Sequence, residues 1–261
     1  MDTSEKNFEA QIEEHLTTHG FIKRDYHNFD AVNAIDSQML FDFIYATQPE
    51  TWQKLETQHG SQVKSNFLKR LTKEIELRGT LDVFRRGVID LGCKFDLTYF
   101  KPEDNLNPDH SRLYQANILT IMRQVHYSPK DTNKSLDTVV FLNGLPVFTI
   151  ELKNPLTNQT VENAIWQYCH TRNPNDPLLK FGRCIAHFAV DTDLVYMTTH
   201  LQGENTRFLP FNQGNDKAAG NPINPNGFKT AYFWEQVLEG DSLLDILNNF
   251  AQLRDILDDR R

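Results

Sequence analysis

A hairpin signal near the middle of the chain constrains its fold more than any other feature. Residues 135–155 read SLDTVVFLNGLPVFTIELKNP, in which two apolar runs are joined by Asn143-Gly144. Asn-Gly between apolar runs is a strong signal of a tight hairpin turn, because such turns need positive φ at their central residues. This segment therefore predicts two antiparallel strands lying side by side.

The hairpin also carries charged residues that point to chemistry. Asp137 opens the first apolar run, while Glu151 and Lys153 close the second. Alternation along a strand puts Glu151 and Lys153 on one face, and Pro155 ends the strand just beyond them. Two carboxylates at the end of adjacent strands favour a hard divalent cation, and an ammonium beside them can stabilise charge on phosphate oxygens. The set is typical of a metal-dependent nuclease, although the Glu-x-Lys triplet alone is more often an ordinary charged strand end.

The register of the hairpin tests this interpretation. A regular two-residue loop would place Asp137 opposite Ile150 and so on the face away from Glu151, because a slip of one residue reverses every side chain. A three-residue loop would place Asp137 opposite Thr149, diagonal to Glu151 and on its face. We therefore predict an odd-length loop or an equivalent bulge. Acids on opposite faces of the hairpin would contradict the site.

The elements around the hairpin predict the fold class. Hydrophobic spacing predicts a strand before the hairpin, then a helix and two strands after it, and two helical regions nearer the N-terminus, the second broken near Gly60. This order predicts an α/β fold with a central mixed β-sheet flanked by helices. The segments are, in that sequence, 116–127, 161–170, 184–190, 193–199, 4–19 and 51–78.

The last quarter of the chain differs in composition. Residues 209–228 are rich in Asn, Gly and Pro, which predicts a surface loop. Residues 232–257 are amphipathic and predict a helix that either packs on its own domain or leads into another. We therefore divide the chain into a domain at 1–205, with a helical insertion at about 48–80, and a loop and helical segment at 206–261.

Composition narrows the functional classes. The net charge of −8 argues against a general nucleic-acid coating protein. It is still compatible with DNA binding through a local basic face between residues 64 and 86. Alternatively, these basic residues form an ordinary solvated helix face, on which Glu74 and Glu76 are interspersed. No Gly-Lys dipeptide occurs, which excludes a P-loop ATP site in this chain. Neither a transmembrane run nor a signal peptide is evident, so we expect a cytoplasmic protein. The basic residues are Lys64, Lys69, Arg70, Lys73, Arg78, Arg85 and Arg86.

Beyond the hairpin, several segments support a family resemblance. Together with residues 136–155 they resemble the N-terminal region of the R subunit of type I restriction enzymes, a branch of the PD-(D/E)xK nucleases with a restriction-endonuclease-like core. The resemblance covers most of the chain. The segments are RQVHYSP at Arg123, QTVENAIWQY at Gln159, HFAVDTDLVYMTTHL at His187, TRFLPFNQG at Thr206 and TAYFWEQVLEGDSLLDIL at Thr230.

The resemblance implies roles for residues of the hairpin. Asp137 and Glu151 would be ligands of Mg²⁺, with Mn²⁺ as an alternative ion. The carbonyl of Leu152 would be a third ligand, and Lys153 would be the catalytic lysine. His187, in an apolar strand, is interpreted as a core histidine and not as a ligand.

It also implies contributions from two helices. Nucleases of this kind often carry an acid on their first helix, for which Glu9 is our candidate and Glu13 the next. Many carry a QxxxY element on the helix after the triplet. Here Gln167 is present, but Thr171 stands four residues on, and Tyr168 is adjacent instead. Gln167 is either a site residue or a polar residue on the open side of the helix.

The function that the resemblance implies is a Mg²⁺-dependent endonuclease domain that cleaves double-stranded DNA by phosphodiester hydrolysis. In that family the R subunit works with methylation and specificity subunits, and its helicase-like motor domain uses ATP. This chain lacks the motor, so we expect little cleavage by the chain alone. The alternatives are a non-catalytic DNA-clamp or subunit-docking module with the same fold, and a free-standing repair-type nuclease.

Overall fold

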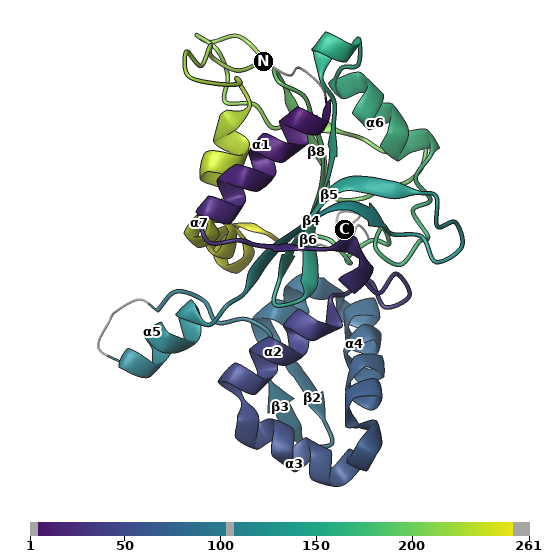
Figure 1. Cartoon of the computed structure of the whole chain (residues 1–261), viewed down its shortest axis with the longest axis vertical. Helices are drawn as coiled ribbons and strands as arrows, with labels where there is room; N and C mark the ends of the chain where they lie inside the picture. The colour runs from purple at the N-terminus through teal and green to yellow at the C-terminus, as the bar shows by residue number, and fades with distance from the viewer. Residues whose placement is uncertain (1–4, 103–106, 253–261) are drawn as a thin grey trace, which may run out of the picture.

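The computed structural model of the chain describes residues 5–102 and 107–252 (Figure 1). Its centre is a seven-stranded mixed sheet in the order β1-β4-β5-β6-β7-β8-β9. β1 is parallel to β4 and β6 is parallel to β7, while the other neighbouring pairs are antiparallel. The strands are β1 (Ile22–Arg24), β4 (Leu119–His126), β5 (Ser135–Leu142), β6 (Leu145–Leu152), β7 (Ala186–Val190), β8 (Val195–Thr198) and β9 (Leu209–Pro210). The predicted α/β class with a mixed sheet is confirmed.

Helices cover both faces of this sheet. α1 (Glu5–Thr18) and the C-terminal helical segment lie on one side, and α6 (Val161–His170) lies on the other (Figure 1). Phe8 of α1 packs edge-on against Trp234 of the C-terminal segment, with ring centroids 5.7 Å apart. α6 begins at a capping box in which Thr160 and Asn163 satisfy each other's backbone N–H groups. The flanking layers thus bury the apolar strands that the sequence predicts.

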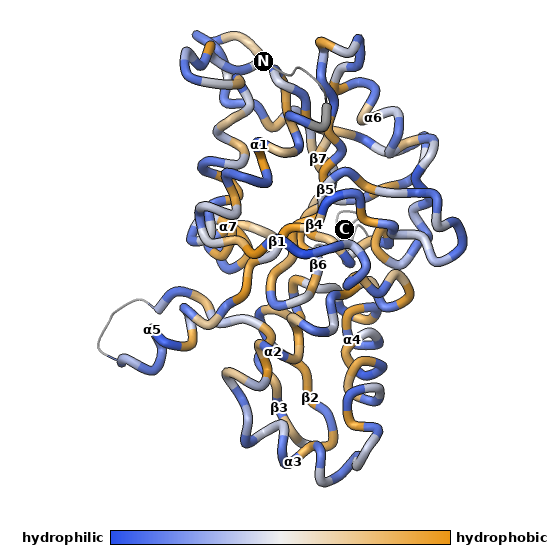
Figure 2. The backbone as a smooth tube through the Cα atoms, in the orientation of Figure 1, coloured by the Kyte–Doolittle hydropathy of each residue, from blue (hydrophilic) through white to orange (hydrophobic). Residues whose placement is uncertain are grey.

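A second lobe extends from one end of the sheet. It contains α2 (Ser37–Thr47), α3 (Pro49–His59), α4 (Val63–Arg86) and the hairpin of β2 (Val88–Asp90) with β3 (Cys93–Phe95). The helical region is broken at Gly60 as predicted, where a short 3₁₀ turn (Gly60–Gln62) intervenes. Its buried residues include Trp52, Leu55, Phe67 and Phe95, and apolar and polar residues alternate along α4 in the hydropathy colours (Figure 2). α5 (Pro108–Gln115) projects beside this lobe.

The central hairpin has the bulge and not the odd-length loop. Asn143 and Gly144, with φ of 50° and 79°, form a two-residue turn, so the bulge is the one of the two predicted arrangements that the hairpin adopts. The pairing shifts by one residue between Val140 and Phe141, which leaves Val147 as the extra residue of β6. Beyond it Thr138 pairs with Ile150, so the next pair along is Asp137 with Glu151. The pairing of Asp137 with Thr149, which a three-residue loop would have given, therefore does not occur, and the two acids share a face as predicted.

The surroundings of the turn explain why the extra residue lies inside the strand. The Asn143 side chain accepts from the N–H of Ile118 at 2.7 Å and donates to the carbonyl of Leu97 at 2.9 Å. A Cβ on Gly144 would stand 2.3 Å from the carbonyl oxygen of Asp36 at the start of α2. Because the tip of the hairpin is held this closely by the lobe, a wider loop has no room there.

The C-terminal segment is helical but not one helix. It consists of the π-helix η4 (Phe233–Val237), α7 (Gly240–Asp245) and the π-helix η5 (Ile246–Phe250). The break occurs because Glu239 is extended, with φ −55° and ψ 141°, and its carboxylate accepts from the N–H of Ser242 to cap α7. The expected helical residues 253–257, and residue 4 of the first expected helix, lie outside the described residues.

Candidate active site

Three polar side chains form a row across the centre of the sheet. The register of β4 with β5 places Gln124 beside Asp137, and the bulged hairpin places Asp137 beside Glu151. Asp137 is 8% exposed and Glu151 is fully buried. Buried charges need partners, because transfer out of water costs an ionised carboxylate many kcal/mol. The partners of these two acids therefore define the site.

Glu151 is held by an arginine that the sequence did not single out. Oε1 accepts from Nε of Arg172 at 2.7 Å and from Nη2 at 2.6 Å. Oε2 is buried, and no described residue forms a hydrogen bond with it. Burial, and next the negative charge of Asp137, raise the pKa of the Glu151 carboxyl well above its usual value, while Arg172 opposes this shift. The open oxygen is a candidate position for a cation.

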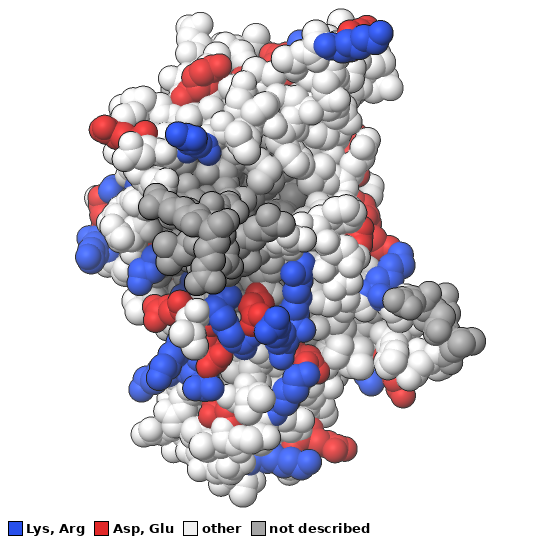
Figure 3. Space-filling view, turned by 180° about the vertical axis from the view of Figure 1, so that it is seen from behind, with Lys and Arg blue, Asp and Glu red and all other residues white. Residues whose placement is uncertain are grey.

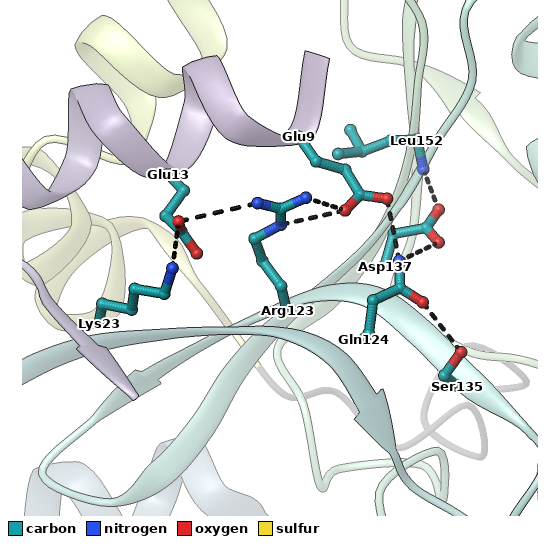
Figure 4. Close-up of polar contacts among 8 residues, drawn as sticks. All are labelled: Glu9, Glu13, Lys23, Arg123, Gln124, Ser135, Asp137 and Leu152. Atoms are coloured by element: carbon teal, nitrogen blue, oxygen red, sulfur yellow. Dashed lines mark hydrogen bonds and ion pairs between the residues drawn. The ribbon is translucent and has the colours of Figure 1, made fainter. Parts of the chain in front are cut away.

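Asp137 is held by the strand that follows it. Its Oδ2 accepts from the backbone N–H of Leu152 at 2.7 Å, and its Oδ1 lies 3.4 Å from Nε2 of Gln124 (Figure 4). Leu152 thus contacts Asp137 through its N–H, whereas the role expected from the sequence concerns its carbonyl. Because the donor is backbone, the Asp137 carboxylate is fixed relative to β6 regardless of side-chain motion.

The acid from the first helix also reaches this site. Glu9 is 3% exposed; its Oε2 accepts from Arg123 at 2.6 and 3.0 Å, and its Oε1 accepts from Gln124 at 2.9 Å. Gln124 therefore bridges Glu9 and Asp137 (Figure 4). Glu13 lies further along α1, where Oε1 pairs with Lys23 at 2.7 Å. Of the two candidate helix acids, the structure brings Glu9 into the network of Asp137.

Lys153 follows the two acids on β6. Its side chain is buried, and its N–H donates to the carbonyl of Val190 at 2.9 Å, which extends the pairing of β6 with β7. Strand alternation gives Lys153 the same face as Glu151. The predicted triplet therefore stands at the end of a central strand, with its acid and its lysine on one side.

α6 brings further polar groups to the same face. Gln167 is half-buried, and its Oε1 has no hydrogen-bond partner among the described residues. The neighbouring Tyr168 is fully buried and shares a 2.8 Å hydrogen bond with Thr149, whose hydroxyl also lies 2.7 Å from Nδ1 of His187. His187 is thus a satisfied core histidine, as interpreted from the sequence.

The donor set fits a small divalent cation. No group of three His, Cys, Asp or Glu side chains in residues 5–102 and 107–252 is arranged to hold a metal ion. Mg²⁺, however, keeps several waters and is often bound through only one or two carboxylates. Asp137 and Glu151 supply two hard oxygen donors on one face, and the unpartnered Oε2 of Glu151 is an acceptor without a donor. These residues would hold such an ion.

Three arginines of α4 form ion pairs with acids on the same helix. On α4, Arg70 and Arg78 pair with Glu74, while Arg78 and Arg86 pair with Asp82. Lys and Arg side chains gather on this side of the molecule with acids among them (Figure 3). Because three of the seven basic residues named from the sequence pair with acids at i, i+4 spacing, the arrangement favours the solvated helix face over a dedicated phosphate-binding surface.

The fold and this site define an α/β protein whose central hairpin presents two buried acids and a lysine. The family described as Type I restriction enzyme R protein N terminus matches residues 3–206. This match covers more than half of the sequence, so the chain belongs to that family, and the resemblance inferred from the sequence is confirmed. Membership implies the context of a restriction endonuclease acting on DNA within a restriction-modification complex. A search of curated proteins gives no match. None of the described helices is long and apolar enough to cross a membrane.

Proposed function

We propose that this chain is the Mg²⁺-dependent endonuclease domain of a type I restriction R subunit and cleaves double-stranded DNA by phosphodiester hydrolysis. The observation that carries the proposal is the one-residue bulge at Val147, which brings Asp137 and Glu151 to one face in a chain of this family. Without that bulge the two acids would face opposite sides of the sheet. An irregularity in the hairpin that sets the face of both acids favours a functional pair over a chance strand end.

The residues take distinct roles in this proposal. Asp137 and Glu151 bind the cation, with the Leu152 carbonyl as a third ligand, and Mn²⁺ is an alternative ion. Lys153 orients water or stabilises charge on the phosphate oxygens, as a compact point charge can. The bound cation would polarise the phosphodiester and lower the pKa of a bound water. Glu9 and Gln167 are proposed to act at the periphery of this centre.

The proposed domain organisation follows from the family. Residues 1–205 form the nuclease domain, and residues 206–261 form a segment that leads toward a motor domain. ATP would be used by that motor, because this chain has no P-loop. Methylation and specificity subunits would complete the complex in the cytoplasm and select the DNA. Cleavage by the chain alone is expected to be weak, since positioning on DNA would come from the other parts.

The test is cleavage by the assembled complex with single isosteric substitutions. Asp137→Asn, Glu151→Gln and Lys153→Met should each lower DNA cleavage by about 10²–10³-fold or more, because each removes charge stabilisation at the reacting phosphate. ATP hydrolysis should persist. Glu56→Gln, which alters an exposed acid on α3, is the matched control and should cleave normally. Unchanged cleavage in the Asp137 and Glu151 variants would refute the proposal.

One observation favours a second candidate, a non-catalytic clamp or docking module. Arg172 already neutralises Glu151 with two short hydrogen bonds, so the acid has a partner without any cation. Calorimetric titration with Mn²⁺ separates the two candidates. The nuclease should show binding that Asp137→Asn abolishes, whereas binding that does not depend on Asp137 would favour the docking module.

A further inference from the structure

Gln124 breaks the alternation of a β-strand at the candidate site. Consecutive strand residues point to opposite faces, so Arg123 and Gln124 should diverge. Instead both donate to the same carboxylate of Glu9, Arg123 to Oε2 and Gln124 to Oε1 at 2.9 Å (Figure 4). The strand must therefore reverse the direction of one side chain at this point.

The reversal is made by a left-handed backbone. Gln124 has φ of 50°, while its neighbours Arg123 and Val125 continue the pairing of β4 with β5. Positive φ is uncommon for residues other than glycine, and glutamine is not among the types that favour it. Such strained residues persist only where their surroundings over-determine them, and they concentrate at functional sites.

The surroundings of Gln124 fix its amide completely. The amide oxygen accepts from the hydroxyl of Ser135 at 3.1 Å. The amide nitrogen, which has two protons, faces Glu9 Oε1 at 2.9 Å and Asp137 Oδ1 at 3.4 Å. One neutral group thus stands between two acids that come from α1 and from β5. It offsets their repulsion without adding a charge of its own.

We infer that Gln124 is a positioning residue that ties Glu9 of the first helix to Asp137 of the central hairpin and so sets the orientation of the acid at the proposed metal centre. This inference rests on the proposed function. Groups that orient a ligand in this way typically change metal affinity by about 10–100-fold when they are removed. The strained backbone is the means by which the amide reaches both acids.

Two substitutions at the same position separate the amide from the strain. Gln124→Ala removes the amide and keeps a Cβ at positive φ, whereas Gln124→Gly removes the amide and relieves the strain. Both should weaken Mn²⁺ binding to the chain by about 10–100-fold, measured by calorimetry. Gln124→Gly should nevertheless unfold at a higher temperature than Gln124→Ala. If Gln124 had a purely structural role, Mn²⁺ affinity would instead change in parallel with the unfolding temperature, and Gln124→Gly would bind more tightly than Gln124→Ala.

Leu91→Gly is the matched control. Leu91 has φ of 43° in the exposed turn between β2 and β3, away from the site. Its replacement by glycine should raise the unfolding temperature and leave Mn²⁺ affinity unchanged. Comparison with Gln124→Gly then shows whether relief of left-handed strain alone affects the metal centre.

The outcomes are distinguishable. If Asp137→Asn abolishes Mn²⁺ binding but Gln124→Gly binds as tightly as the unaltered chain, the role of Gln124 is overturned and the proposed function stands. If the unaltered chain shows no Asp137-dependent Mn²⁺ binding, the proposed function falls, and the role of Gln124 falls with it. Should Gln124→Ala fail to fold, Gln124→Gly decides the question.

Discussion

The α4 helix and the central site both crowd acids with arginines, but burial makes their energetics different. On α4 the side chain of Arg86 is 79% exposed while it pairs with Asp82. In the site the side chain of Arg172 is 9% exposed and that of Glu151 is fully buried. Water screens the first pair and solvates either partner when the other is removed. The second pair has no such alternative, so each partner depends on the other.

The burial of an ion pair therefore decides its contribution to stability more than its geometry does. Both pairs are short, at 3.1 Å for Arg86 with Asp82 and 2.6 Å for Arg172 with Glu151. Exposed pairs typically contribute about 0–1 kcal/mol, whereas breaking a buried pair from one side costs about 3–5 kcal/mol. Substitutions at the two sites can test this difference directly.

The largest effect on the free energy of unfolding is expected from a substitution of Arg172. Arg172→Ala should lower the free energy of unfolding by about 3–5 kcal/mol, because it leaves Glu151 buried without its cation. Urea denaturation of the metal-free chain measures the change. The double variant Arg172→Ala with Glu151→Gln should recover part of the loss, since no buried charge then remains. A loss below about 1 kcal/mol in the single variant would show that Glu151 reaches water.

An intermediate effect on the free energy of unfolding is expected when the pH is lowered, because of His187. Burial, and next the charge of His200, lower the pKa of the His187 imidazole to about 3. The unfolded chain binds this proton near pH 6.5 and the folded chain does not, so stability is lost as pH falls below 6.5. The contribution is up to about 1.4 kcal/mol per pH unit between pH 6.5 and 5.

Unfolding measured across this pH range in His187→Gln gives the test. The variant should have a flatter profile than the unaltered chain, while His110→Gln, which changes an exposed histidine on α5, should leave the slope unaltered. An equally steep profile in His187→Gln would assign the slope to other groups.

The smallest effect is expected on α4. Arg86→Ala removes an exposed i, i+4 partner of Asp82 and should change the free energy of unfolding by no more than about 0.5 kcal/mol. Urea denaturation at low and at high salt should give the same result within error, because little is lost that salt could screen. A loss near that of Arg172→Ala would contradict the distinction between the two regions.

Local patterns predicted the elements of this fold well. The Asn143-Gly144 turn, the helix over residues 161–170 and the break at Gly60 all depend on neighbours in sequence, and the structure has each of them. The bulge was one of two options that the shared face of Asp137 and Glu151 allowed. Choosing between them required the contact of Gly144 with α2, which no local pattern reveals.

The partners of the acids could not be predicted in the same way. Arg123 and Gln124 meet Glu9 across more than a hundred residues of chain, and Arg172 meets Glu151 from beyond the end of α6. Arginine and glutamine in such positions look like ordinary polar surface residues. Only the pairing of β4 with β5 and the left-handed backbone of Gln124 bring these donors to the carboxylates.

The bulge at Val147 has a genetic consequence. A deletion of this single codon would keep every acid, every lysine and the Asn-Gly turn in the reading frame. The shortened hairpin could then pair regularly from Leu142 with Leu145 outward, and Asp137 would still stand opposite Glu151 on the same face of the sheet. An odd number of residues between the acids thus obliges a hairpin with this two-residue turn to carry a bulge, whereas an even number would bring the same two acids together in a regular ladder.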